Sequence, residues 1–330
     1  MKVTHRMIAK ATGFTQSTVS KALNSTGRVS EKTTETIRRA AKEMGYYSQE
    51  RKNHNRRESH LFPQIAVLVP EISSWYYANL VEMLQAQIER LGGSLCVFVT
   101  GFVPGKALLQ LETLKVQNTF DGIVVLDYPD QAMNADVPLI MVTGETAYVP
   151  TDKQYLIRYE DRIERLVSHL TELGHREIGF LGETNTTDKL TTFCDVMRKR
   201  RLPLNMDFIY TSQYRFERIG HDGVAALARR GAVPTALICA YDEVAFGAIE
   251  ELEKLGYDVP GRVSVVGINN IEYCVHFKPP LTTTQLNPAL LRDAFTEIIQ
   301  KAIIEEGACA RRFDIPSELI VRKSTAPCPT

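Results

Sequence analysis

Apolar residues recur every three or four positions along the first 45 residues, which is the spacing of amphipathic helices. Three apolar stripes follow one another, formed by Ile8, Ala9 and Ala11, by Val19, Ala22 and Leu23, and by Ile37, Ala40, Ala41 and Met44. Thr4, Thr15 and Ser30 precede the stripes and can cap the helices, and Gly13 and Gly45 can end them. The pattern predicts three short helices with a glycine turn between the first and the second.

The second predicted helix has a polar outer face. Gln16, Ser17, Ser20 and Lys21 lie on it near the start of the helix, where a recognition helix presents side chains to base edges in the DNA major groove. The other interpretation is a small three-helix bundle without a ligand. Charge favours DNA, because residues 1–60 hold 13 of the 39 Lys and Arg residues but only 5 of the 39 Asp and Glu residues. The phosphate backbone attracts such a basic head on an acidic remainder.

After Pro63 the pattern changes to alternating strands and helices. Strand-like apolar runs occupy 65–69, 94–99, 122–126, 139–142, 178–181, 235–239 and 263–268, and helical stripes lie at 80–91, 162–173, 243–255 and 288–304. Repeated strand–helix units predict parallel sheets with helices on both faces, and two sheets fit this length better than one. Ligands of doubly wound folds bind outside the carboxyl ends of the strands, so a cleft between two lobes is the expected pocket.

Composition narrows the function classes. No stretch approaches about 18 uninterrupted apolar residues and the N-terminus has no apolar signal core, so we expect a cytoplasmic protein without a membrane partner. The six cysteines are scattered, which favours buried reduced thiols over a metal site. The sequence has no phosphate loop, nucleophile elbow or metal-binding His-Glu-x-x-His helix, and Asp242-Glu243 fits an acidic helix cap better than a catalytic pair. We therefore expect neither enzymatic activity nor a cofactor.

Several short motifs along the chain resemble those of the LacI/GalR family of bacterial transcription regulators. They are Ala9, Gly13, Thr18-Val19-Ser20, Asn24, Val29-Ser30 and Gly45-Tyr46, with further matches at 121–124, 169–178, 242–248, 260–267 and 279–283. The resemblance implies an α/β protein with a three-helix helix-turn-helix head and a two-lobed, periplasmic-binding-protein-like, doubly wound body. The chain of such a body crosses between its lobes near residues 153, 284 and 315. A homodimer on two half-sites of double-stranded operator DNA is also implied.

The resemblance assigns DNA contacts as well. Gln16 and Ser17 take the two main base-reading positions, and Lys21 takes a third position where the family usually has Arg. Lysine is a point charge without the planar fork of arginine, so it should read guanine less sharply. The candidate DNA contacts are Thr4, Thr15, Gln16, Ser17, Thr18, Ser20, Lys21, Asn24, Arg28, Arg56 and Arg57.

Three domains are expected, namely a helix-turn-helix domain (1–48), a basic linker or atypical hinge (49–62) and an effector-binding and dimerisation domain (63–330). Within the third, one lobe takes about 63–153 and 285–315, and the other takes about 154–284 and 316–330. The family's hinge helix carries an Ala and a Leu that opens the minor groove, but here Lys52 and Asn55 stand at those positions. Either Arg56 and Arg57 lie in a narrow groove as charges, or the hinge does not fold and acts as a tether.

The candidate effector pocket also departs from sugar-binding members of the family. Positions that commonly hold Arg, Asn and Asp hold Lys189, Tyr241 and Asn269, and Thr143 stands where Asp is frequent. Carboxylates bind neutral sugars by accepting hydrogen bonds from their hydroxyl groups. A pocket that has fewer carboxylates but keeps a cation favours an anionic, phosphorylated or acid-sugar effector. Three of these residues also have an interpretation that needs no ligand. Trp75 could be an aromatic residue of the core, Lys189 a solvated lysine at a helix start, and Asn269 part of a turn. The candidate effector contacts are Ser74, Trp75, Tyr76, Thr143, Lys189, Tyr241, Asp242 and Asn269.

The sequence therefore predicts a sequence-specific transcriptional repressor that a small carbohydrate-derived metabolite controls. The alternative is a cytosolic small-molecule binding protein whose DNA-binding head is degenerate. The altered hinge is the feature that supports this alternative.

Overall fold

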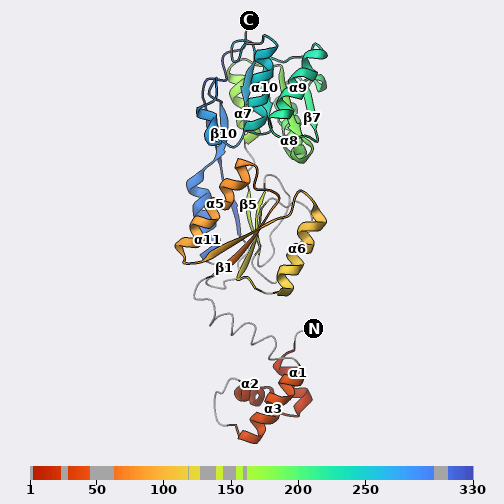
Figure 1. The fold of residues 1–330 in the computed structure, drawn as a ribbon, viewed down its shortest axis with the longest axis vertical. Helices are drawn as coiled ribbons and strands as arrows, with labels where there is room; N and C mark the ends of the chain where they lie inside the picture. Colours follow the sequence, from red (N-terminus) through yellow and green to blue (C-terminus); the bar gives the residue numbers. More distant parts are fainter. Residues whose placement is uncertain are drawn as a thin grey trace. The chain divides into compact units, whose positions relative to one another are not determined.

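The computed structural model describes residues 3–23, 29–44, 63–117, 119–126, 139–143, 154–158, 162–300 and 311–329. The chain divides into two compact units, of which the first contains Met1–Pro63 and the second begins at Gln64 (Figure 1). We call them the head and the body. Among the described residues no helix has the length and apolar character needed to cross a membrane.

The described residues of the head form three helices, and local side-chain caps start them. They are α1 (His5–Thr12), α2 (Gln16–Leu23) and α3 (Glu31–Glu43). The hydroxyl of Thr4 accepts from the backbone N–H of Met7 at 3.4 Å, and the hydroxyl of Thr15 accepts from that of Thr18 at 3.1 Å. Gly13 follows α1 with a φ of +75°, a left-handed conformation that glycine adopts without strain. The predicted helices and the glycine turn are confirmed.

The core of the head contains most of the predicted apolar stripe residues. Its fully or nearly fully buried members are Ile8, Val19, Ala22, Ile37 and Ala41. Ala11 is exposed, so its predicted burial is wrong, because the inner face of the short helix α1 is already occupied by Ile8 and its neighbours. Asn24, Arg28, Arg56, Arg57 and the predicted linker lie outside the described residues.

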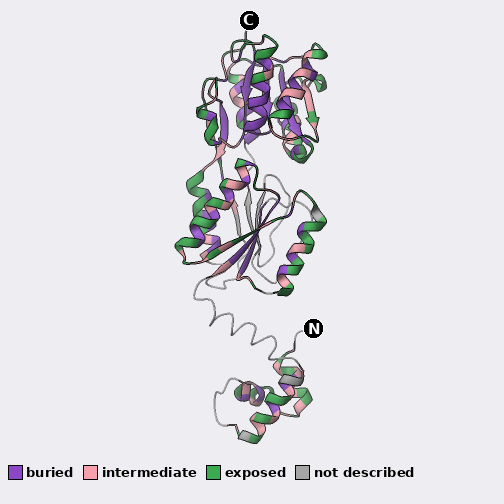
Figure 2. Cartoon of the chain, viewed as in Figure 1, coloured by how far each residue is buried: buried purple, intermediate pink, exposed green. Residues whose placement is uncertain are grey.

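The first half of the body is built on a six-stranded parallel sheet with the order β11-β5-β4-β3-β1-β2. The strands are β1 (Gln64–Val69), β2 (Ser94–Val99), β3 (Gly122–Leu126), β4 (Leu139–Thr143), β5 (Gln154–Arg158) and β11 (Arg311–Asp314). Helices α5 (Trp75–Arg90) and α11 (Pro288–Ile299) pack on one face, and α6 (Pro104–Gln117) packs on the other. Strand β3 and all of β1 after its first residue are buried (Figure 2). We call this part lobe 1.

The second half of the body, lobe 2, is built on a four-stranded parallel sheet with the order β7-β6-β8-β9. Its strands are β6 (Ile178–Glu183), β7 (Ile209–Ser212), β8 (Ala236–Cys239) and β9 (Ser264–Val266). Its helices are α7 (Arg162–Glu172), α8 (Thr187–Lys199), α9 (Glu217–Arg229) and α10 (Asp242–Lys254), with single 3₁₀ turns at Thr184–Thr186, Met206–Phe208 and Glu272–Val275. The predicted α/β architecture with two parallel sheets is confirmed.

The chain passes between the lobes where short strands meet. Strand β5 pairs in parallel with β4, so 154–158 belongs to lobe 1 and the first crossing comes after Arg158, later than the expected position near 153. The other two crossings lie next to a two-stranded antiparallel ribbon, which is formed by β10 (Thr283–Leu286) and β12 (Ser317–Ile320).

Cys96 on β2 is exposed, which corrects the expectation that the thiols are buried, whereas Cys239 and Cys274 lie in the core of lobe 2.

Candidate functional site

Helix α2 of the head carries most of the residues that the sequence assigned to base reading. Gln16, Ser17 and Lys21 are exposed, while Val19 and Ala22 on the opposite face are buried in the core of the head. The hydroxyls of Thr15 and Thr18 lie 2.9 Å apart at the start of the helix and fix its first turn. The helix therefore presents an amide, a hydroxyl and one cation on a single exposed face, which suits hydrogen bonding to base edges.

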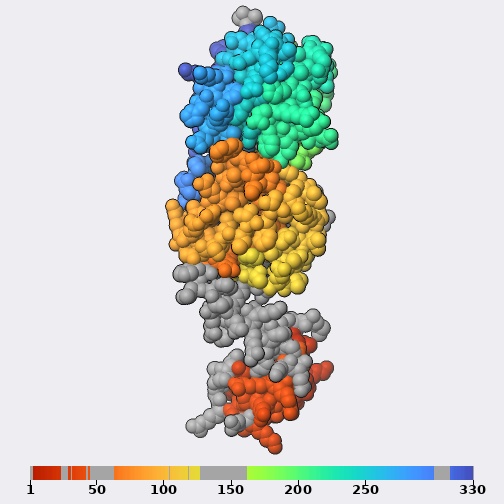
Figure 3. Space-filling view, in the orientation of Figure 1, coloured from red at the N-terminus to blue at the C-terminus, as the bar shows by residue number. Residues whose placement is uncertain are grey.

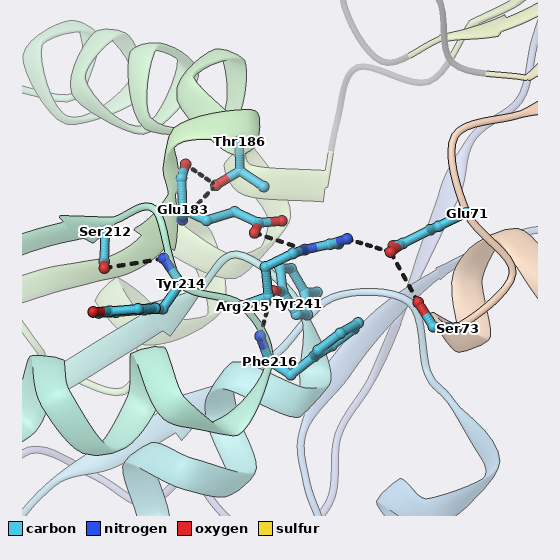
Figure 4. A network of polar contacts seen from close by, with 9 residues as sticks. All are labelled: Glu71, Ser73, Glu183, Thr186, Ser212, Tyr214, Arg215, Phe216 and Tyr241. Atoms are coloured by element: carbon cyan, nitrogen blue, oxygen red, sulfur yellow. Dashed lines mark hydrogen bonds and ion pairs between the residues drawn. The ribbon is translucent and has the colours of Figure 1, made fainter. Parts of the chain in front are cut away.

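In the body, charged side chains gather where the strands of both lobes end. Glu71 follows β1 of lobe 1, and Glu183 ends β6 of lobe 2. Arg215 follows β7 and contacts both carboxylates, through Nε to Glu183 Oε2 at 2.9 Å and through Nη1 to Glu71 Oε2 (Figure 4). Arg215 therefore joins the two lobes at the carboxyl ends of their parallel strands, which is the ligand-binding edge of doubly wound folds.

Aromatic rings enclose the guanidinium of Arg215. Its Cζ atom lies 4.7 Å from the ring centre of Phe102 in lobe 1 and 4.7 Å from that of Phe216 in lobe 2. Burial acts to lower the pKa of Arg215, but its hydrogen bond to Glu71 and the charges of Glu183 and Glu71 raise the pKa above its ordinary value. Burial of Glu183 raises the pKa of that carboxyl more than Arg215 lowers it. Arg215 is therefore firmly charged and is held from both lobes.

Two predicted effector residues, Lys189 and Tyr241, lie next to this cluster. The ammonium of Lys189 donates to the backbone carbonyl of Ala240 at 2.9 Å and lies 5.8 Å from the ring centre of Tyr241. The hydroxyl of Tyr241 accepts from the backbone N–H of Phe216 at 2.9 Å, and burial raises its pKa. Tyr241 thus fixes the segment that carries Arg215, and Lys189 is a half-buried cation, not the fully solvated lysine of the interpretation without a ligand.

Asp242 has a structural role in this arrangement, unlike the predicted effector contact. It is fully buried, and its carboxylate accepts from the backbone N–H of Ile271 at 2.9 Å and from the hydroxyl of Thr283 at 2.5 Å. A side chain without exposed surface and with both oxygens engaged has no access to a ligand in the cleft. Asp242 instead ties the start of α10 to β10 and to the loop after β9.

The remaining predicted effector residues are spread over other positions. Ser74 caps α5, accepting from the backbone N–H of Tyr77 at 3.4 Å, and Trp75 is 46% exposed at the first position of that helix. Tyr76 and Asn269 line a different cavity of about 390 Å³ bounded by α5, α11 and β10. Thr143 ends β4, and its side chain lies outside what the structure describes. Lys189 and Tyr241 thus lie beside each other, and Tyr76 and Asn269 line a common cavity.

Sequence reasoning missed Glu71, Glu183 and Arg215. The two glutamates end or closely follow predicted strands, so a search for charged residues just beyond strand ends would have found them. The same search would not have found Arg215, because the four-residue strand β7 that precedes it was not predicted.

Glu243, in the first turn of α10, carries a pH-dependent prediction. Burial raises its pKa to about 7, with the charges of Asp242 and Glu217 acting in the same direction and Lys189 opposing them. Since the folded protein then holds a proton that the unfolded chain has released, the free energy of unfolding falls as the pH rises from 4.5 through 7. A glutamine at this position would not titrate, so the variant should not lose this stability. We therefore expect the unfolding free energy of Glu243→Gln, relative to that of the parent chain, to increase by about 3 kcal/mol from pH 5 to pH 8.

Urea unfolding followed by circular dichroism at both pH values measures this difference. Glu253→Gln, on the exposed side of the same helix, is the matched control and should show no such gain. A stability difference between Glu243→Gln and the parent chain that does not change with pH would contradict the assignment.

Comparison with known proteins gives two family matches. Residues 6–49 match the model described as bacterial regulatory proteins, lacI family, and residues 167–325 match the periplasmic binding protein-like domain. The chain is 26% identical to the HTH-type transcriptional regulator DegA of Bacillus subtilis (strain 168) over 100% of both chains. It is 27% identical to the HTH-type transcriptional repressor PurR of Haemophilus influenzae (strain PittEE) over 96% of this chain and 97% of that one.

Solved structures share the fold along almost the whole chain. The Lac repressor dimer bound to operator and the anti-inducer ONPF aligns with a TM-score of 0.69 at 21% identity, covering 99% of this chain and 100% of that one. The transcriptional regulator CelR in complex with cellobiose aligns with a TM-score of 0.66 at 21% identity, covering 98% and 100%. The helical head and the two-lobed body therefore occur together in known proteins.

Proposed function

Since this chain belongs to the lacI family of bacterial regulatory proteins, we propose that it represses transcription as a homodimer that binds operator DNA in the cytoplasm and responds to a small metabolite. One observation carries the DNA-binding part. Helix α2 exposes Gln16, Ser17 and Lys21 opposite its buried face, in the most basic segment of the chain. This is the arrangement of a recognition helix, with specific side chains outward and phosphate attraction around them. The family consists of regulators, and we propose no catalytic activity.

Selection of bound sequences from a random pool of duplex DNA tests this function. The full chain should enrich a two-fold symmetric site, because a homodimer presents the same helix to each half-site. Lack of any enriched sequence would contradict the proposal and favour the alternative, a small-molecule binding protein with a degenerate head.

The dimer interface that we propose is formed by β2 and α6 of lobe 1. Strand β2 is an edge strand of its sheet, and this region exposes Val97 (42%), Val99 (46%), Leu109 (69%) and Val116 (77%). The segments that carry these residues form part of the surface coloured orange to yellow in Figure 3. Apolar side chains on an unpaired edge favour association with a second copy, because association removes them from water.

Sedimentation velocity of charged variants tests this interface. Val99→Asp should shift the dimer toward monomer, since a carboxylate would be desolvated at the contact. Leu255→Asp in lobe 2, where the leucine is 45% exposed, is the matched control and should leave the dimer intact. An unchanged dimer in Val99→Asp would place the interface elsewhere.

For the metabolite, we propose a sugar or an anionic sugar derivative bound in the interlobe cleft beside Arg215 and Lys189. Arg215 lies in the loop after β7, and Lys189 lies in the first turn of α8, the helix that follows β6. Doubly wound folds bind ligands at this edge of the sheet. Regulation requires that this ligand favours one arrangement of the lobes, because only differential binding shifts an equilibrium.

A further inference from the structure

Glu71 and Arg215 connect the two lobes directly across the cleft. Arg215 is anchored on the lobe 2 side, because its Nε donates to Glu183 Oε2 at 2.9 Å and its guanidinium stacks on Phe216. Glu183 is itself fixed, since its backbone N–H and C=O both bond to the hydroxyl of Thr186. Glu71 comes from the loop after β1, so its ion pair with Arg215 joins the two lobes (Figure 4). Phe102 of lobe 1 also contacts the guanidinium.

The carboxylate of Glu71 is incompletely satisfied in this position. Its Oε2 accepts from Arg215 and from the hydroxyl of Ser73 at 2.9 Å. Its Oε1 is buried and has no hydrogen-bond partner among the described residues. A buried carboxylate oxygen without a partner is costly, so Glu71 is a weaker ligand for the guanidinium than an anion that engages it through two oxygens.

We propose that Glu71 is an internal stand-in for an anionic effector. A metabolite that carries a carboxylate or a phosphate binds by taking the place of Glu71 on the guanidinium of Arg215. This inference rests on the proposed function and names the ligand chemistry of its cleft. The guanidinium fork matches a carboxylate or phosphate through paired N–H donors. The charge of Lys189 lowers the pKa of Glu183, so Lys189 lies near enough to supply a second cation beside the site.

Replacement of Glu71 has a mechanical consequence. Without an effector, the Glu71–Arg215 ion pair links lobe 1 to lobe 2. An anion bound to Arg215 removes this link, while the contact of the guanidinium with the Phe102 ring of lobe 1 does not depend on Glu71. Ligand binding and lobe arrangement are thereby coupled through one ion pair, and the coupling is reciprocal.

Thermal shift and calorimetry of the full chain with inorganic phosphate and gluconate test the proposal, with glucose as the neutral probe. Glu71→Gln should bind the two anions about tenfold more tightly than the parent chain, because the competing charge is gone while the shape is kept. Arg215→Gln should lose anion binding, and Arg215→Lys should weaken it. Glu253→Gln, at an exposed position of α10, is the matched control and should change nothing.

Anion affinity that is unchanged or reduced in Glu71→Gln would overturn the inference, and so would equal gains for glucose. Absence of anion binding in both the parent chain and Glu71→Gln would overturn it too. Circular dichroism verifies that each variant is folded. The chain could enrich a symmetric DNA site while the variants do not show the expected anion affinities. In that case the role of Glu71 is refuted and the proposed DNA-binding function stands.

Discussion

Replacing Gly247 with alanine is expected to unfold lobe 2 at moderate temperature. Helices α9 and α10 cross with their backbones in contact, and a Cβ at Gly247 would lie 1.9 Å from the carbonyl oxygen of Glu217. Gly220 makes the reciprocal approach, since its Cβ would lie 2.2 Å from the backbone of Val244 and Ala248. Backbone atoms cannot move aside as a flexible side chain can. Separating the two helices should cost about 3–5 kcal/mol.

Thermal unfolding followed by circular dichroism measures this effect. Gly105→Ala in α6 is the matched control, because its Cβ would meet nothing within 4 Å. That substitution should be neutral or stabilise by up to about 1 kcal/mol through helix propensity. If Gly247→Ala unfolded at the same temperature as Gly105→Ala, the close approach of α9 and α10 would be refuted.

Replacing Asp242 with alanine should destabilise lobe 2 by about 2–4 kcal/mol. The substitution leaves the backbone N–H of Ile271 and the hydroxyl of Thr283 without their acceptor in a fully buried position. Burial raises the pKa of Asp242 while these hydrogen bonds and the charge of Arg322 lower it, so the surroundings are built to hold this carboxyl. Asp242→Asn keeps an oxygen acceptor and should lose less.

Urea unfolding of the two variants tests this account against Asp222→Ala. Asp222 is a half-exposed residue of α9 that pairs with Arg218 at 3.3 Å, and its loss should cost less than about 1 kcal/mol. Equal midpoints for Asp242→Ala and Asp222→Ala would show that Asp242 does not tie α10 to β10.

The head could be predicted from the sequence because its determinants are local. Thr4 and Thr15 cap helices that begin at the next position, and Gly13 adopts the left-handed turn that its lack of a side chain allows. In the body, the longer apolar runs were predicted correctly. The strands β5, β7, β10, β11 and β12 were not predicted, because polar or charged residues interrupt or flank their short apolar runs.

The sequence led to two neighbours of the cluster around Arg215 but not to its charged residues. Lys189 and Tyr241 were found by resemblance, and they do border the cluster around Arg215. Asp242 was misread, since an acidic residue at a helix start looks the same in sequence whether it faces a ligand or the core. Arg215 and Glu71 lie 144 positions apart, and only the fold brings them together.

The affinities of Gln16→Ala and Lys21→Ala for the selected site and for random duplex DNA show whether α2 reads DNA sequence. Each variant should lose about 1–3 kcal/mol of binding on the selected site and little on random DNA, because base contacts carry the sequence preference. Lys10→Ala, which removes an exposed cation of α1, is the control and should affect both DNAs alike. Equal losses on both DNAs for Lys21→Ala and Gln16→Ala would show that α2 does not read base sequence.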